Sequence, residues 1–210
     1  MTQKCRLCQH PMDFFDSARN RDYYRCPQCD SIQLNHEQLL NPMDEKKRYD
    51  THNNDIMDKG YQSFVSPITN YILNHFDKDD QGLDFGAGPG PVISKLLMDQ
   101  SYSISQYDPF YHPDNELLNK SYDYIIACEV IEHFNHPKSS FNAIKKSTKT
   151  NGQWIFMTYL YDDSIDFQKW HYKNDETHVI FYSKKTLEYI KNIYQFKSLI
   201  INNRLIIFSN

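Results

Sequence analysis

The stretch LDFGAGPG at residues 83–90 joins a short apolar segment to a turn rich in glycine. The chain has only six glycines, and three of them, Gly86, Gly88 and Gly90, lie within five residues. Glycine adopts positive φ and lets another molecule approach the backbone, so this turn predicts a ligand site. A tight strand-to-helix connection is the alternative explanation. Open parallel sheets bind ligands beyond the carboxyl ends of their strands, which is where this turn is expected.

The details of the turn disfavour a dinucleotide. The fingerprint G-x-G-x-x-G places a pyrophosphate on the amides of a helix N-terminus. Here the third glycine comes one residue earlier, and Pro89 and Pro91 remove two amide donors. Asp84, directly before the turn, is unsuited to a pyrophosphate and suited to an ammonium or sulfonium charge. The turn therefore predicts a ligand without a pyrophosphate.

A second acidic residue extends this prediction. Asp108 lies 20 residues after Gly88, at the end of the next predicted strand. A carboxylate in this place accepts hydrogen bonds from the hydroxyls of a ribose. Pro109 and Phe110 follow directly and are candidates for the wall of an adenine pocket. An aspartate that forms a turn before proline is the structural alternative, and the glycine turn upstream favours the ribose.

Strand and helix signals alternate through most of the chain and predict an α/β fold. The sheet is expected to be Rossmann-like, doubly wound and mostly parallel, with an antiparallel hairpin at its C-terminal edge. The expected strands are 81–85, 103–107, 122–127, 153–158, 197–201 and 204–208, and the expected helices are 43–50, 61–76, 90–99, 137–147 and 184–194.

Together with YDYIIACEVIEHF at 122–134, the glycine turn and Asp108 resemble class I S-adenosylmethionine-dependent methyltransferases. The resemblance covers roughly residues 60–210, and the string EVIEH is typical of the branch that acts on small molecules. It implies S-adenosyl-L-methionine as cofactor, with Asp108 on its ribose and Glu129 closing the pocket. The residues implied at its methionine end are Asp84, Gly86, Ala87, Gly88 and Gly90.

Methyl transfer to an O–H or N–H group also requires that a proton be removed, and histidine is the commonest base for this task. The two candidates are His178, beyond the fifth strand of the sheet, and His133, at the end of EVIEH. Each has a structural alternative, as a packed side chain of a lid for His178 and as an orienting group of the next helix for His133. Tyr49, Tyr61 and Trp170 are candidates for an aromatic roof over the pocket.

The N-terminus carries a different signal. Cys5 and Cys8 form one C-x2-C pair, Cys26 and Cys29 form another, and seventeen residues separate the pairs. This spacing predicts a zinc ribbon or knuckle in which four thiolates saturate the metal, so the zinc is expected to be structural. The chain is expected to divide into a zinc-binding module at 1–35, a helical linker at 36–60 and a methyltransferase domain at 61–210.

Composition narrows the functional classes. The formal net charge is −4, and residues 1–35 carry five Lys or Arg against four Asp. This balance favours a small-molecule acceptor over an RNA or tRNA acceptor docked through the zinc module, because nucleic-acid binding depends on neutralising phosphates. A binding protein that keeps the fold without activity is the third alternative. Paired cysteines and the lack of an apolar run of about 18 residues predict a cytoplasmic protein without membrane contact.

Overall fold

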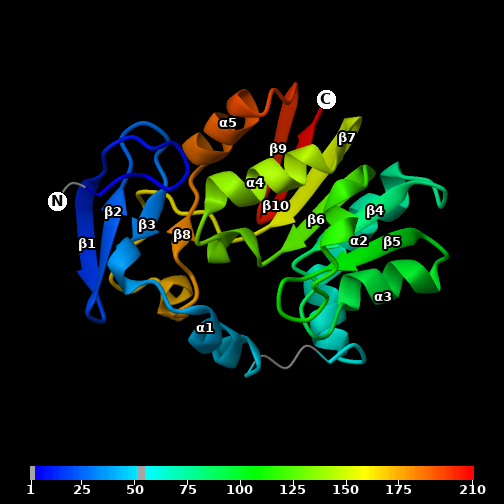
Figure 1. Cartoon of the computed structure of the whole chain (residues 1–210), viewed down its shortest axis with the longest axis horizontal. Coiled ribbons are helices and arrows are strands. Elements are labelled where there is room, and N and C mark those ends of the chain that lie inside the picture. Colours follow the sequence, from blue (N-terminus) through cyan, green and yellow to red (C-terminus); the bar gives the residue numbers. More distant parts are fainter. Residues whose placement is uncertain (1–2, 52–54) are drawn as a thin grey trace.

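The computed structural model describes residues 3–51 and 55–210 and contains two sheets flanked by helices (Figure 1). The larger sheet has six strands in the order β5-β4-β6-β7-β10-β9. Their bounds are β4 Gln81–Phe85, β5 Ser103–Tyr107, β6 Tyr122–Cys128, β7 Thr148–Met157, β9 Ser198–Asn202 and β10 Leu205–Ser209. The first four run parallel, and β10 pairs antiparallel with both β7 and β9. The predicted fold class is confirmed.

Helices cover both faces of this sheet. The bounds of the α-helices in the described residues are α1 Pro42–Tyr49, α2 Lys59–His75, α3 Val92–Asp99, α4 Pro137–Lys146 and α5 Lys184–Ile193, and the last four pack on the sheet. Buried side chains of α2 and α3, such as Ile68 and Leu97, share one apolar cluster with Ile126 of β6. Phe141 of α4 and Leu187 of α5 belong to the other cluster. Each central strand is therefore buried on both faces, as in other parallel sheets.

Successive side chains along each central strand pack alternately into these two apolar clusters. Ile125 of β6 lies in the cluster of α4 and α5, whereas the next residue, Ile126, lies in the cluster of α2 and α3. Trp154 and Ile155 of β7 divide in the same way. This division follows from the period-2 geometry of a strand, in which successive side chains point to opposite faces.

The smaller sheet has four antiparallel strands in the order β1-β2-β3-β8. Their bounds are β1 Asp13–Ala18, β2 Arg21–Arg25, β3 Ile32–Leu34 and β8 Ile180–Phe181. The fourth strand comes from the segment after β7, so distant parts of the chain build one sheet. Figure 1 shows β8 beside the N-terminal strands. No helix in the described parts of the chain is long and apolar enough to cross a membrane.

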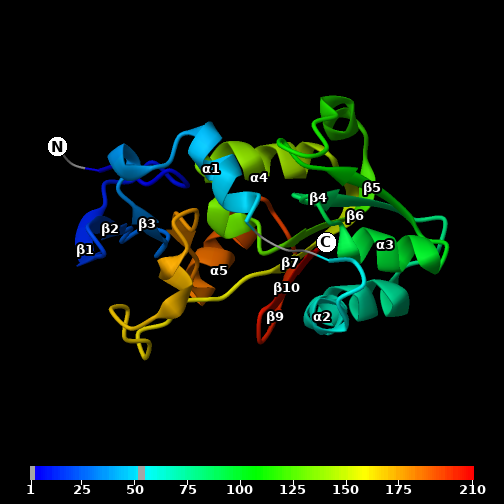
Figure 2. The same cartoon turned by 90° about the horizontal axis from the view of Figure 1, so that it is seen from below.

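Arg6 fixes the small sheet against the large domain. It donates 2.7 Å and 3.1 Å hydrogen bonds to the carbonyl oxygens of Val179 and Asn135, and its Nε donates to Oε1 of Gln33. The guanidinium thus bridges the N-terminal strands, the loop after β6 and the segment leading to β8. The helix α1 lies between the small sheet and the β4–β5 side of the large one in both views (Figures 1 and 2).

Candidate functional site

A cavity of 590 Å³ opens at the carboxyl ends of β4, β5 and β6. Its floor is made by three loops, at 85–91, 107–111 and 128–136, and its cover by side chains of α1 and α2. Strands β5 and β6 lie on opposite sides of β4, so the strand order reverses here. Such a switch point is the usual ligand site of an open α/β sheet.

The glycine turn has the backbone that its sequence predicts. Gly86 and Gly88 have φ values of +83° and +65°. The amides of Gly86 and Ala87 donate to the carbonyl oxygen of Tyr107, at 2.8 Å and 3.1 Å. A Cβ on Gly86 would lie 2.6 Å from the methyl groups of Val130, so a larger residue does not fit. Gly90 also lines the cavity.

Asp108 lies at the end of β5, and its carboxylate is held by backbone amides. Oδ2 accepts a 3.0 Å hydrogen bond from the amide of Gly88, and Oδ1 accepts from the amides of Phe110 and Tyr111 at 2.8 Å and 3.1 Å. The residue is 7% exposed and lines the cavity, as do Pro109 and Phe110. A carboxylate has about four lone-pair positions, so Asp108 retains capacity for a ligand hydroxyl.

Asp84 is the other acidic residue of the glycine motif. It is buried at the end of β4, lines the cavity and accepts a 2.7 Å hydrogen bond from the hydroxyl of Ser94 in α3. Burial raises the pKa of Asp84 to about 7, and this outweighs the hydrogen bond from Ser94, which lowers it. A positive charge placed against this carboxylate would favour its ionised form.

Glu129 follows β6 with a φ of +52°, which is rare for a residue with a side chain. Strained backbone of this kind gathers at functional sites. Oε2 accepts a 3.0 Å hydrogen bond from the hydroxyl of Tyr172, and Oε1 lies 3.6 Å from Nη1 of Arg204. Burial raises the pKa of Glu129 to about 6, while Arg204 and Tyr172 lower it.

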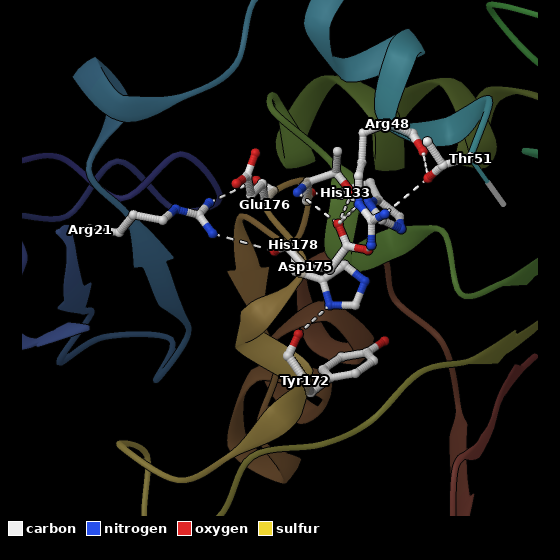
Figure 3. A network of polar contacts seen from close by, with 9 residues as sticks. Arg21, Arg48, Thr51, His133, Tyr172, Asp175, Glu176 and His178 are labelled. Atoms are coloured by element: carbon white, nitrogen blue, oxygen red, sulfur yellow. Dashed lines mark hydrogen bonds and ion pairs between the residues drawn. The ribbon is translucent and has the colours of Figure 1, made fainter. Parts of the chain in front are cut away.

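His133 and His178 lie together at the cavity wall, with ring centroids 4.7 Å apart. Nδ1 of His133 is 3.0 Å from the carbonyl oxygen of Thr177. Nδ1 of His178 is 2.6 Å from the carbonyl oxygen of Tyr172 (Figure 3). A carbonyl only accepts, so both Nδ1 atoms are protonated. In each neutral ring the lone pair then belongs to Nε2.

A polar network ties α1 to the segment that carries His178 (Figure 3). Arg48 of α1 forms an ion pair with Asp175, at 2.7 Å from Nη2 to Oδ2. Arg21 of β2 donates to the carbonyl oxygens of Asp175 and Glu176, at 3.3 Å and 2.8 Å. The ring of Tyr49 meets the edge of His133 with centroids 5.3 Å apart. The cover of the cavity is therefore anchored beside the two histidines.

The aromatic roof differs from the sequence prediction in one residue. Tyr49 and Tyr61 line the cavity. Trp170 is outside its lining and is packed against Phe167 and Phe181, with centroids 6.2 Å and 5.0 Å away. Residue 170 lies in the segment that docks on the small sheet, and the apolar ring is buried in that contact.

Sequence reasoning missed Glu132, which lies beside the two histidines, and Glu45, which lines the cavity. Glu132 is fully buried and accepts a hydrogen bond from the hydroxyl of Tyr172. The only signal was the second glutamate of EVIEH, because the contact with Tyr172 spans 40 residues. Glu45 of α1, which accepts a 2.7 Å hydrogen bond from Tyr49, also lines the cavity and gave no motif.

The four N-terminal cysteines converge. Their sulfur atoms all lie within 4.8 Å of one another, with Cys5 3.5 Å from Cys29 and Cys8 3.3 Å from Cys26. Sulfurs placed tetrahedrally about 2.3 Å from a zinc ion are about 3.8 Å apart. The spacing of these thiols therefore fits a single tetrahedral metal ion.

Comparison with known proteins shows the family. Residues 57–198 match the family model described as a methyltransferase domain, and the chain belongs to that family. No curated protein matches the chain.

Solved structures share the fold at low sequence identity. A Pyrococcus horikoshii protein has a TM-score of 0.53 at 16% identity, over 74% of this chain and 94% of its own. The 1,6-didemethyltoxoflavin-N1-methyltransferase of Burkholderia thailandensis has a TM-score of 0.53 at 10% identity, covering 93% and 97%. Human N-acetylserotonin methyltransferase has 0.54 at 12% identity, covering 79% of this chain and 56% of the human one.

Proposed function

We propose that this chain transfers a methyl group from S-adenosylmethionine to a small-molecule acceptor. The observation that carries the proposal is that one cavity holds the glycine turn, Asp108 and the pair of His133 and His178. Its volume of 590 Å³ lies within the range of about 300–1,000 Å³ that is usual for small-molecule sites. Two similar structures, the toxoflavin and N-acetylserotonin enzymes, hold S-adenosylhomocysteine and S-adenosylmethionine respectively, which agrees with this donor.

The donor-binding roles follow from the chemistry of the lining. The carboxylate of Asp108 accepts hydrogen bonds from the ribose, with Pro109 and Phe110 beside the adenine. Gly86, Ala87, Gly88 and Gly90 let the methionine end approach the backbone, and Asp84 faces its positive charge, with Glu129 closing that side. The bound donor supplies an electrophilic methyl group on a sulfonium.

The acceptor side is assigned to His133 and His178. The protein's task in methyl transfer is to align the acceptor with the methyl group and to exclude water, which is mainly a positioning effect. Tyr49 and Tyr61 cover the cavity and supply aromatic bodies for this purpose. The two histidines are our candidates for the residues that contact the reacting group of the acceptor.

We also propose that Cys5, Cys8, Cys26 and Cys29 hold one structural zinc ion. The fit of the sulfur spacing supports this role. Four thiolates leave no coordination position for water or substrate, so the ion would stabilise the fold and take no part in the chemistry. The division of the chain at residues 35 and 60 and a cytoplasmic location remain predictions.

The alternative acceptor is RNA or tRNA, docked through the N-terminal module. The basic side chains of that module are largely engaged within the protein. Arg6 and Arg21 donate to backbone carbonyls, and Arg25 pairs with Asp30 and Asp163 at 2.8 Å and 2.6 Å. They are therefore poorly placed to neutralise phosphates, which favours the small-molecule acceptor.

The test is to supply S-adenosylmethionine carrying a labelled methyl group together with a fractionated cell extract. We expect label in the small-molecule fraction and none in RNA. Label confined to RNA, with salt-sensitive RNA binding, would favour the alternative acceptor. A folded protein that binds the donor weakly or not at all and labels neither fraction would support the third alternative, a binding protein without activity.

A further inference from the structure

Three side chains beside the cavity form a group with the composition of a metal site. Glu132, His133 and His178 each offer one ligand atom, and these atoms all lie within 4.8 Å of one another. Glu132 and His133 belong to the short helix η3, Ile131–His133, and His178 comes from the segment after η4, His171–Asn174. The group is separate from the four cysteines and lies against the cavity, because both histidines line it.

Glu132 supplies an independent observation. Its side chain is 0% exposed, and its Oε2 has no hydrogen-bond partner within the described parts of the chain. Its other oxygen, Oε1, accepts from the hydroxyl of Tyr172. A buried carboxylate oxygen without a partner is costly, and such groups in folded proteins are usually paired or bound to a metal ion.

The first glutamate of the motif, Glu129, makes this cost larger. The hydroxyl of Tyr172 has one proton, yet it lies within hydrogen-bond distance of both Glu129 and Glu132. Arg204 forms an ion pair with Glu129, at 3.6 Å. A cation beside Glu132 would supply the compensation that the single tyrosine proton cannot give to two carboxylates.

The histidines are oriented as metal ligands are. In each, Nδ1–H donates to a backbone carbonyl oxygen, at 3.0 Å for His133 and 2.6 Å for His178 (Figure 3). Histidines that bind metals nearly always donate their other ring N–H in this way, which fixes the tautomer and the ring. In each neutral ring the lone pair is therefore on Nε2, which is the atom that a metal ion would bind.

We infer that Glu132, His133 and His178 bind a divalent transition-metal ion whose open coordination positions face the cavity. Two imidazoles and one carboxylate suit zinc, iron or manganese, and three protein ligands leave room for a further group. An oxygen atom of the acceptor would fill that position, so the two histidines would then act on the acceptor through the ion rather than by direct contact. This last step rests on the proposed function and narrows the acceptor to molecules that carry a hydroxyl or carbonyl oxygen near the methylated group.

The test uses Mn²⁺ as probe with the full chain carrying one equivalent of zinc, because the four soft thiolates take that zinc and leave Mn²⁺ to the nitrogen and oxygen ligands. Electron paramagnetic resonance of free Mn²⁺ gives the bound fraction. We expect one saturable site, weakened at least about tenfold in Glu132→Gln and in His178→Ala, since loss even of a supporting residue costs 10–100-fold. His171→Ala, an exposed histidine of the same segment, should bind Mn²⁺ as the wild type does.

A parallel titration with S-adenosylhomocysteine separates this inference from the proposed function. Absence of a saturable Mn²⁺ site, or equal affinity in the wild type and both ligand variants, overturns the metal site. If S-adenosylhomocysteine still binds to a protein without the Mn²⁺ site, the proposed function is unaffected. Failure of the folded protein to bind the analogue overturns the proposed function, and Mn²⁺ binding by the three residues then stands alone.

Discussion

The amide of Gly88 donates a 3.0 Å hydrogen bond to Oδ2 of Asp108. This contact joins the glycine turn after β4 to the acidic residue that ends β5, so the two sequence signals form one structural unit. The carboxylate is fixed by amides on both of its oxygens before any ligand arrives. Such preorganisation reduces the entropy that binding must overcome.

Replacement of Asp108 tests the ribose contact. Asp108→Ala removes the charge-assisted hydrogen bonds to the ribose hydroxyls, and we expect donor binding to weaken by about 1.5–3 kcal/mol, or more where the turn also loosens. Calorimetric titration with S-adenosylmethionine measures this change. Asp114→Ala, at an exposed position of the same loop, is the matched control and should bind normally. Unchanged affinity in Asp108→Ala would remove this residue from the donor site.

Asp84 gives a pH dependence. Its pKa of about 7 means that the free protein holds this carboxyl largely protonated below neutral pH. The positively charged donor binds best to the ionised form, so its affinity should fall as the pH drops from 8 to 6, with a proton released on binding below pH 7. Calorimetry in buffers of different ionisation enthalpy measures that proton. In Asp84→Asn this pH dependence should vanish, and its persistence would assign the titration to another group.

The same raised pKa of Asp84 makes the folding stability of the protein fall as the pH rises, whereas the affinity for the donor increases with pH. Because the folded state holds the proton of Asp84 more tightly than the unfolded state, stability is greatest below the unfolded pKa and decreases as the pH rises through 7. We expect the ligand-free protein to melt at lower temperature at pH 8 than at pH 6, by a margin that shrinks in Asp84→Asn. An equal margin in both proteins would contradict this assignment.

Gly86 tests the strain of the turn. Gly86→Ala places a Cβ 2.6 Å from Val130 at a φ of +83°. A residue in this region costs about 1–3 kcal/mol, and the displaced turn should also weaken donor binding. Denaturant unfolding measures the first effect. The control is Gly60→Ala in α2, whose Cβ would meet only the flexible side chain of Asp58, at 3.1 Å. Equal stability of the two variants would contradict the strain.

The cysteine cluster is tested by metal content. We expect about one zinc per chain in the wild type and almost none in Cys26→Ser, accompanied by loss of the N-terminal strands, because metal binding supplies folding energy to small modules. Elemental analysis and hydrogen exchange over residues 3–35 measure these effects. A folded small sheet without metal would show that thiol packing alone supports it.

Local signals predicted the large sheet well. The expected strands 81–85 and 103–107 coincide with β4 and β5, because apolar runs bounded by glycine, proline and polar turns define them. The strand expected at 153–158 begins earlier, since Thr148 already pairs with Tyr122 of β6 before a register shift, and β7 extends over Thr148–Met157. The two-residue strand β8 has no signal of its own, since its pairing with β3 is a tertiary contact.

In the site, too, residues of a local sequence motif could be predicted, whereas residues that depend on tertiary contacts could not. The glycine turn and Asp108 were readable from their residue types and their separation of 20 positions. Glu132 was not, because its neighbour Tyr172 is 40 residues away and meets it only after the segment following β7 folds back. The hydrogen bonds of Arg6 to backbone carbonyls likewise depend on the fold, and the sequence showed only that residue 6 is basic.

The central claim is that the cavity at the ends of β4, β5 and β6 binds S-adenosylmethionine. The most direct measurement is a calorimetric titration of the purified, folded chain with S-adenosylhomocysteine, which the cavity should accept with the same ribose and adenine contacts. We predict saturable binding of about one molecule per chain, weakened in Asp108→Ala. A folded, zinc-loaded protein that shows no binding of either molecule would contradict the account.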